Sequence, residues 1–374
     1  MLMKGLVITN YGFEEECSKE IVRITKKATN CEKTAVIFET DDVSDFIKVV
    51  YTSQSAIKVL CLLGSFTFKS EKDILDGVKK INFDDQFDDD QKFMVRVKRN
   101  TSIIESAKNL EAEIGEIIKG EADLKNPDIE FYCYFYENTA YIGIDMSFID
   151  LSKRDYKVFC GSNSLKSTIC FSMLSLAGYD PKKTILDPFS SDGTFGIEAA
   201  FFATKKPVQF YNREKFGFHR LNLFKGIDIV KCFDELDKLQ KEIPLHIFIS
   251  DYVMKGVVAA RKNAKIAGVL DMINFSRVDM DWLDIKYGKN STDIIIGRPP
   301  VQSSGVSKNH AEKFYTSFFK RAHQILKESG KIVFIVVHEK LILDYAIVAG
   351  FKVDKTLDTK QGDMDLKVLV MSKS

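Results

Sequence analysis

The pattern of hydrophobic and polar residues begins with short elements that alternate in type. Residues 1–65 predict a strand, a helix, a strand, a helix and a strand, in that order. The first helix, FEEECSKEIVRITKKA, has acidic residues in its first turn and lysines in its last, as the helix dipole favours. This alternation predicts a small α+β layer with helices on one side of a sheet.

A basic strand follows an acidic, turn-like spacer. In the stretch KFMVRVKRN, the side chains of Phe93, Val95 and Val97 point to one face, and those of Arg96 and Lys98 point to the other. The polar face is a candidate ligand surface, and a merely solvated strand face is the competing interpretation.

A helix and a hairpin complete the N-terminal half. The helix is expected to begin at a cap on Thr101 or Ser102 and to end at Gly120, because hydroxyl oxygens accept free N–H groups and glycine terminates helices. Two apolar runs around Glu137–Asn138 predict a hairpin of two strands.

From about Lys166 the pattern changes to alternating strands and helices. The predicted strands are 184–187, 245–251, 272–279, 293–297 and 331–338, and the predicted helices are 194–203, 253–267 and 311–328. Two final apolar runs, joined by the polar turn KQGDMD, predict an antiparallel hairpin. The fold class is therefore α/β, with a doubly wound Rossmann-like sheet whose last strand is antiparallel. This arrangement resembles the class I S-adenosylmethionine methyltransferases.

Composition narrows the function classes. The 374 residues are 45% hydrophobic and 29% charged with a formal net charge of +1, which is ordinary for a globular protein and does not by itself mark a nucleic-acid-binding one. No apolar run reaches membrane-spanning length, so we expect no membrane interaction. The cysteines form no CxxC pair and the histidines show no metal-like spacing, so we expect reduced thiols and no metal.

Ligands of doubly wound sheets bind at the carboxyl ends of the strands, so residues at those ends are candidates. The run ILDPFSSDGTFGIEAA ends a strand at Asp187 and opens a helix at about Thr194. The loop between them contains Ser190, Ser191 and Gly193, and a ligand could approach its backbone N–H groups closely. An ordinary strand–helix turn is the competing interpretation.

Two further strand ends carry carboxylates. Asp251 is placed to accept hydrogen bonds from ribose hydroxyls, or to cap the helix that follows it. Asp279 is placed to accept from an adenine amino group, while the nearby Asp281 and Asp284 fit surface acids in a loop equally well.

The fourth strand end, DIIIGRPPVQ, leaves the sheet rigidly. Gly297 ends the strand, and Arg298 is followed by Pro299 and Pro300, which lack the N–H groups that extend a sheet. In a methyltransferase sheet, this turn would lie beside the methyl acceptor.

Taken in order, these segments resemble the THUMP-domain RNA methyltransferases of the guanine-N2 type, especially the archaeal and bacterial enzymes that modify guanosine in the tRNA acceptor stem. FMVRVKRN is similar to the family's basic THUMP strand, LSKRDY to its linker, and DPFSSDGTFGIEAA to its DPFCGSGTxxIEAA motif. The resemblance implies an N-terminal ferredoxin-like domain (1–65), a THUMP RNA-binding domain (66–150), a linker (151–165) and a methyltransferase domain (166–374).

The resemblance also implies a cofactor and a partner. S-adenosyl-L-methionine would be the cofactor, and tRNA would be bound at its acceptor stem and 3′ end by a cytoplasmic monomer that flips the target base into the pocket. The implied RNA phosphate contacts are Arg96, Lys98, Arg99, Lys153 and Arg154. The implied cofactor-binding residues are Asp187, Ser190, Ser191, Gly193, Thr194, Asp251, Asp279 and Gly297, and the implied catalytic residues are Arg298, Pro299 and Pro300.

Three positions depart from the family pattern. Arg298 stands where the family has Asn or Asp, Val301 where it has an aromatic residue, and Ser191 where it has a glycine. Arginine has five donors and no acceptor, so it cannot accept the hydrogens of an amine. Either the chain is a methyltransferase in which the carbonyls of the Pro-Pro turn hold the amine and Arg298 binds a phosphate or a different base, or it is an RNA-binding protein with a weakened or lost catalytic site.

Overall fold

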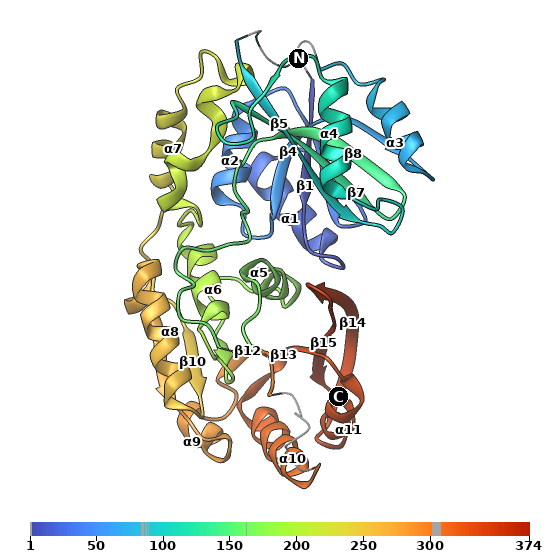
Figure 1. Ribbon diagram of the computed structural model, residues 1–374. Helices are drawn as coiled ribbons and strands as arrows, with labels where there is room; N and C mark the ends of the chain where they lie inside the picture. The colour runs from blue at the N-terminus through green and yellow to red at the C-terminus, as the bar shows by residue number, and fades with distance from the viewer. Residues whose placement is uncertain (1, 84–85, 87, 89, 162, 301–307) are drawn as a thin grey trace. The chain divides into compact units, whose positions relative to one another are not determined.

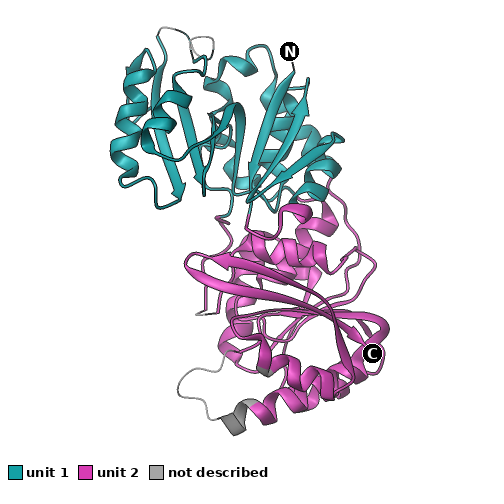
Figure 2. Cartoon of the chain, turned by 90° about the vertical axis from the view of Figure 1, so that its right-hand side faces the viewer, with its two compact units in different colours: residues 1–9, 17–152, 207–238 teal, residues 10–16, 153–206, 239–374 magenta. Residues whose placement is uncertain are grey.

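The computed structural model describes the chain except residues 1, 84–85, 87, 89, 162 and 301–307. The chain divides into two compact units, each built around its own sheet. Residues 1–9, 17–152 and 207–238 form the first unit, and residues 10–16, 153–206 and 239–374 form the second (Figure 2). Among the described residues, no helix is long and apolar enough to cross a membrane.

The first unit contains an eight-stranded sheet with the strand order β2-β3-β1-β4-β8-β7-β5-β6 (Figure 1). Its neighbouring strands are antiparallel, except that β5 pairs in parallel with β6 and with β7. The strands are β1 (Met3–Ile8), β2 (Thr29–Glu32), β3 (Ala35–Thr40), β4 (Lys58–Thr67), β5 (Lys92–Asn100), β6 (Glu121–Ala122), β7 (Ile129–Tyr136) and β8 (Thr139–Asp145). The accompanying helices are α1 (Glu14–Thr25), α2 (Ser44–Thr52), α3 (Glu71–Val78), α4 (Ala107–Ile117) and α7 (Ile229–Asp237).

One continuous sheet joins the predicted N-terminal layer to the region after it. Strand β4 pairs with β1 on one side and with β8 on the other, so the predicted hairpin of β7 and β8 extends the sheet that β1 and β3 begin. The expected boundary between residues 65 and 66 lies inside β4. The division of the chain into four segments stays a prediction.

The helix after β5 begins later than expected. Its N-cap is Ser106, whose hydroxyl accepts the Asn109 N–H at 3.2 Å, and not Thr101 or Ser102. Ile104 is buried between these candidates, so the preceding residues form an irregular segment anchored in the core.

Most of the long segment between the predicted strands 184–187 and 245–251 is an insertion that belongs to the first unit. Residues 207–238 contain three 3-10 turns, η1 (Phe210–Lys215), η2 (Gly217–Arg220) and η3 (Asn222–Phe224), followed by α7. Phe218 and Phe233 are buried in the same core as Tyr51 of α2, and the ring centroids of Tyr51 and Phe233 are 4.7 Å apart. The insertion therefore covers apolar surface that α2 presents.

The second unit contains a seven-stranded sheet with the strand order β11-β10-β9-β12-β13-β15-β14. The first five strands in this order, from β11 at the edge to β13, are parallel. Strands β15 and β14 form an antiparallel hairpin at the other edge (red in Figure 1), as predicted. The strands are β9 (Ile185–Asp187), β10 (Ile247–Asp251), β11 (Ile273–Arg277), β12 (Thr292–Gly297), β13 (Leu326–Val336), β14 (Phe351–Gln361) and β15 (Met364–Lys373). The helices are α5 (Ser167–Leu176), α6 (Thr194–Thr204), α8 (Met254–Ala267), α9 (Leu283–Tyr287), α10 (Lys308–Ile325) and α11 (Glu339–Val348).

Phe233→Ala is expected to lower the free energy of unfolding by about 3–5 kcal/mol, because a buried ring is lost and the cavity refills only partly. Urea unfolding of the full chain, followed by circular dichroism, measures the change. Tyr211→Ala is the matched control, since Tyr211 is 60% exposed in the same insertion. Equal effects of the two variants would contradict packing of the insertion on the core of the first unit.

Candidate active site

The loop after β9 places a buried carboxylate at the end of that strand. The Asp187 side chain is 2% exposed and accepts the Phe189 N–H at 3.0 Å. Ser190 Oγ is buried and has no hydrogen-bond partner within the described residues. At the start of α6, the Thr194 hydroxyl donates to Asp192 at 2.7 Å, which fixes the end of the loop.

Two residues of this loop have a left-handed backbone. Gly193 has a φ of 80°, and a side chain there would lie 2.8 Å from the Ala260 Cβ, so glycine is required where α6 packs on α8. Ser191 has a φ of 48°, a conformation that costs a residue other than glycine about 1–2 kcal/mol. Ser191 therefore has a backbone conformation that glycine would adopt at a lower cost.

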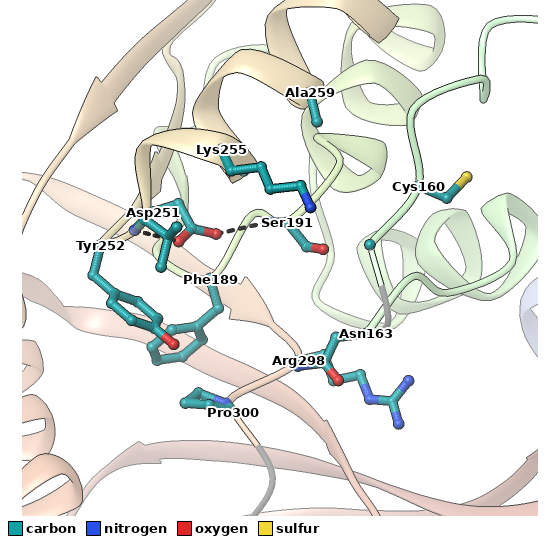
Figure 3. Close-up of a pocket in the computed structure, with 13 residues that line it drawn as sticks. Cys160, Asn163, Phe189, Ser191, Asp251, Tyr252, Lys255, Ala259, Arg298 and Pro300 are labelled. Atoms are coloured by element: carbon teal, nitrogen blue, oxygen red, sulfur yellow. Dashed lines mark hydrogen bonds between the residues drawn. The ribbon is translucent and has the colours of Figure 1, made fainter.

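Asp251 connects this loop to the end of β10. One carboxylate oxygen accepts the Ser191 N–H at 3.0 Å, and the other accepts the Val253 N–H at 2.8 Å (Figure 3). A carboxylate offers about four lone-pair sites, so both oxygens keep capacity for a ligand hydroxyl. A side chain at Gly256 would approach the Asp251 carboxylate to 2.6 Å, so glycine keeps this space open.

A pocket of about 280 Å³ opens at this edge of the sheet (Figure 3). Four predicted site residues line it: Ser191, Asp251, Arg298 and Pro300. The other predicted cofactor and catalytic residues lie outside this lining: Asp187, Ser190, Gly193, Thr194, Asp279, Gly297 and Pro299. The strand-end argument thus located the pocket, and most of the remaining residues form the loops and strand ends around it.

Sequence reasoning missed several lining residues. Tyr252, Val253 and Lys255 directly follow Asp251, so reading on past the strand end would have found them. Cys160 and Asn163 come from the predicted linker, where no periodicity or motif marks a ligand-facing residue.

Asp279 lies at the surface and not in the pocket. Its exposed side chain accepts the Asp281 N–H at 3.3 Å and so caps the short turn η5 (Met280–Trp282). A contact between Asp279 and an adenine stays a prediction. Among the described residues, no group of three or more His, Cys, Asp or Glu is arranged to hold a metal ion.

Arg298 brings a positive charge to the pocket. Its side chain is buried, with Nη2 donating to the Met364 sulfur at 3.3 Å, and Nε has no hydrogen-bond partner among the residues that the structure describes. Burial lowers the pKa of Arg298, but an arginine stays charged at neutral pH.

Four of the five predicted RNA contacts are exposed. Arg96, Lys98 and Arg99 lie on β5, and Lys153 begins the second of the three segments that form the second unit. The Arg96 guanidinium is exposed and lies 3.8 Å from the carboxylate of Glu130, which is buried.

Arg154, the fifth predicted RNA contact, is buried and not exposed. Its side chain is 0% exposed, and Nε donates to Glu198 Oε1 at 3.0 Å. The Tyr156 hydroxyl donates to the same oxygen at 2.8 Å. The expected phosphate contact is wrong, because α6 supplies Arg154 with a buried carboxylate partner.

Arg154→Met is expected to lower the free energy of unfolding by about 3–5 kcal/mol, because the Glu198 carboxylate stays buried without its counter-ion. Lys153→Met, at the exposed neighbouring position, should change stability by less than about 0.5 kcal/mol. Urea unfolding at neutral pH measures both variants. A small effect of both would argue against the buried ion pair.

Burial raises the pKa of Asp187 well above its usual value, and the nearby carboxylates of Asp251 and Asp192 add to this shift. The Phe189 N–H opposes it. A raised folded-state pKa means that the folded chain binds the proton more tightly than the unfolded chain. The resulting stability is full below the unfolded-state pKa and is lost as the pH rises through the folded-state pKa.

Asp187→Asn keeps an oxygen that can accept from Phe189 and removes the titrating proton. We expect the variant to lose less stability than the wild type as the pH rises from about 4, the unfolded-state pKa, to about 8. Urea unfolding at several pH values measures the difference. Parallel pH profiles would be incompatible with a raised pKa at Asp187.

Known proteins resemble the chain over its whole length. The tRNA (guanine(6)-N2)-methyltransferase of Methanocaldococcus jannaschii is 26% identical over 389 positions, which cover 99% of this chain and 100% of that protein. The crystal structure of SMU.472 complexed with SAH gives a TM-score of 0.82 at 17% identity and covers 100% of this chain and 98% of that chain. A structure described as a possible methylase, from Clostridium difficile 630, gives a TM-score of 0.84 at 19% identity. It covers 100% of this chain and 99% of that chain. These two structures share the fold.

Two family models match successive parts of the chain. The THUMP domain model matches residues 68–145, in the first unit. The model described as an RMKL-like methyltransferase domain matches residues 154–366, which is more than half of the chain and contains the whole pocket lining. The chain therefore belongs to the RMKL-like methyltransferase family and carries a THUMP domain before its methyltransferase domain.

Proposed function

We propose that the protein transfers a methyl group from S-adenosylmethionine to the N2 amine of a guanosine in the acceptor stem of tRNA. The methyltransferase domain, the THUMP domain and the full-length similarity to a tRNA (guanine(6)-N2)-methyltransferase support this proposal. The observation that carries it is the pocket at the carboxyl ends of β9, β10 and β12, which has Asp251 on one side and the turn of Arg298 and Pro300 on another (Figure 3).

The residues of the pocket fit a nucleoside methyl donor. Asp251 lines the pocket and keeps lone pairs for ribose hydroxyls. Tyr252 and Val253 are 48% and 44% exposed beside it, and they offer apolar surface to an adenine ring. S-adenosylmethionine supplies an activated methyl group on a sulfonium; the task of these residues is to bind and orient it.

The Pro-Pro turn holds the acceptor side of the pocket. The Tyr315 hydroxyl donates to the Pro300 carbonyl at 2.8 Å, which ties the turn to α10. In this proposal, the Pro299 carbonyl accepts a hydrogen of the guanine amine and directs the nitrogen lone pair toward the methyl group. Such pre-organised dipoles lower a barrier because they need no rearrangement during the reaction. Val301, at the family's aromatic position, lies outside the described residues.

The exposed basic residues would bring the RNA to the pocket. Arg96, Lys98, Arg99 and Lys153 are the proposed phosphate contacts, because phosphate contacts position an RNA without reading its sequence. The target base would leave the stack, since its amine is unreachable within a helix. We also propose that the protein acts as a monomer in the cytoplasm.

Asp251→Asn is expected to weaken binding of S-adenosylhomocysteine by on the order of tenfold, because an amide has one acceptor oxygen where the carboxylate has two. Methyl transfer to transcribed tRNA should fall with it. Calorimetry measures the affinity, and mass spectrometry of nucleosides detects N2-methylguanosine. Asp271→Asn is the control, at an exposed carboxylate outside the pocket.

Two results would contradict the proposal in different ways. If the wild-type protein bound S-adenosylhomocysteine and tRNA but transferred no methyl group, the RNA-binding alternative would be favoured. If Asp251→Asn bound S-adenosylhomocysteine as the wild type does, the assignment of Asp251 to the donor would be wrong.

A further inference from the structure

Arg298 is a buried cation that the described fold leaves without a counter-ion. The residue is 7% exposed, and it forms no ion pair with a described carboxylate. Within the described part of the chain, its Nε has no hydrogen-bond partner, and Nη2 donates to the Met364 sulfur at 3.3 Å. Sulfur is a weak acceptor, so most of the hydrogen-bonding capacity of this guanidinium is unused.

Other arginines in or near the interior of the two units are neutralised by acids. Arg154 pairs with Glu198 at 3.0 Å, and Arg321 pairs with Asp284 at 2.9 Å. An unpaired buried charge is costly, because neither water nor an opposite charge compensates it. Arg298 therefore differs from the arginines with a structural role in this chain, and its partner is expected to come from outside the fold.

The pocket is the open space beside Arg298. Lys255 also lines it, so the lining includes two cations. Its described carboxylate, Asp251, already accepts two backbone N–H groups. In Figure 3, the Arg298 side chain lies beside Asn163 and extends away from Asp251. The pocket is therefore suited to a negatively charged group on the Arg298 side.

We infer that Arg298 forms an oxyanion subsite of this pocket, which binds a phosphate or carboxylate group of a substrate. The inference rests on the proposed function and names the chemistry that the pocket recognises beside the Pro-Pro turn. The planar guanidinium matches two oxygens of either group at once. Arg298 then positions a substrate and takes no proton from the amine.

Two groups of the proposed reaction have this chemistry: a phosphate of the acceptor nucleotide and the carboxylate of the methyl donor. Arg298→Met keeps the length and volume of the stem and removes the charge. The probes are S-adenosylhomocysteine, which has the carboxylate, 5′-methylthioadenosine, which lacks it, and a transcribed tRNA. Calorimetry and filter binding give the affinities of the wild type, Arg298→Met, Arg298→Lys and the exposed control Lys320→Met.

If Arg298 binds the carboxylate, Arg298→Met should weaken the binding of S-adenosylhomocysteine on the order of tenfold or more. The affinity for 5′-methylthioadenosine should stay unchanged. If Arg298 binds a phosphate, Arg298→Met should bind both nucleosides as the wild type does. Its affinity for tRNA should fall on the order of tenfold, and the salt dependence of tRNA binding should correspond to about one fewer released ion. Arg298→Lys should retain part of the affinity in either case, and Lys320→Met all of it.

The thermal midpoint of the free protein separates this inference from a structural role. Because an uncompensated buried charge is removed, Arg298→Met should be as stable as the wild type or more stable. Two results would overturn the inference. One is an affinity of Arg298→Met for all three probes that equals that of the wild type. The other is an Arg298→Met variant that unfolds, together with an Arg298→Lys variant that binds no probe better than Arg298→Met does. A wild-type protein that transferred no methyl group would instead contradict the proposed function, since the subsite is judged by binding alone.

Discussion

The parallel pairing of β10 with β9 and of β9 with β12 is the constraint on which the candidate site depends. The register aligns Ile249 of β10 with Asp187 of β9, and Ile295 of β12 with Leu186. All three strands therefore end at the same edge, and groups far apart in the sequence meet there. The hydrogen bond from the Ser191 N–H to the Asp251 carboxylate joins residues that are 60 positions apart in the sequence. No local conformational preference of the backbone could bring these two groups together.

The strand ends could be predicted from the sequence because their signal is local. Short apolar runs followed by Asp187, Asp251 or Gly297 mark buried parallel strands whose ends carry polar groups. The antiparallel hairpin of β14 and β15 was predicted for the same reason. By contrast, the cap of α4 was predicted at Thr101 or Ser102 but lies at Ser106, because the buried Ile104 anchors the preceding segment in the core.

Residues whose environment depends on distant chain segments could not be placed from the sequence. Arg154 and Lys153 are adjacent and both positively charged, yet one is buried against Glu198 and the other is exposed. The insertion 207–238 lies between β9 and β10 of the second sheet, but its Phe233 ring packs on Tyr51 in the first unit. In both cases the deciding partner is remote in sequence, so neither periodicity nor composition carries the information.

Two of the three departures from the family pattern, those at Ser191 and Arg298, differ in physical kind. Ser191 has a left-handed backbone, with a φ of 48°, and its N–H donates to Asp251, so this residue adopts, at a cost in strain, a conformation that a glycine would adopt more readily. Arg298 replaces an acceptor with a donor, which no backbone adjustment can reverse. We therefore expect the chemistry of this chain to differ from the family pattern more at the turn next to Pro299 and Pro300, where we propose that a substrate group binds, than at the loop that would hold the methyl donor.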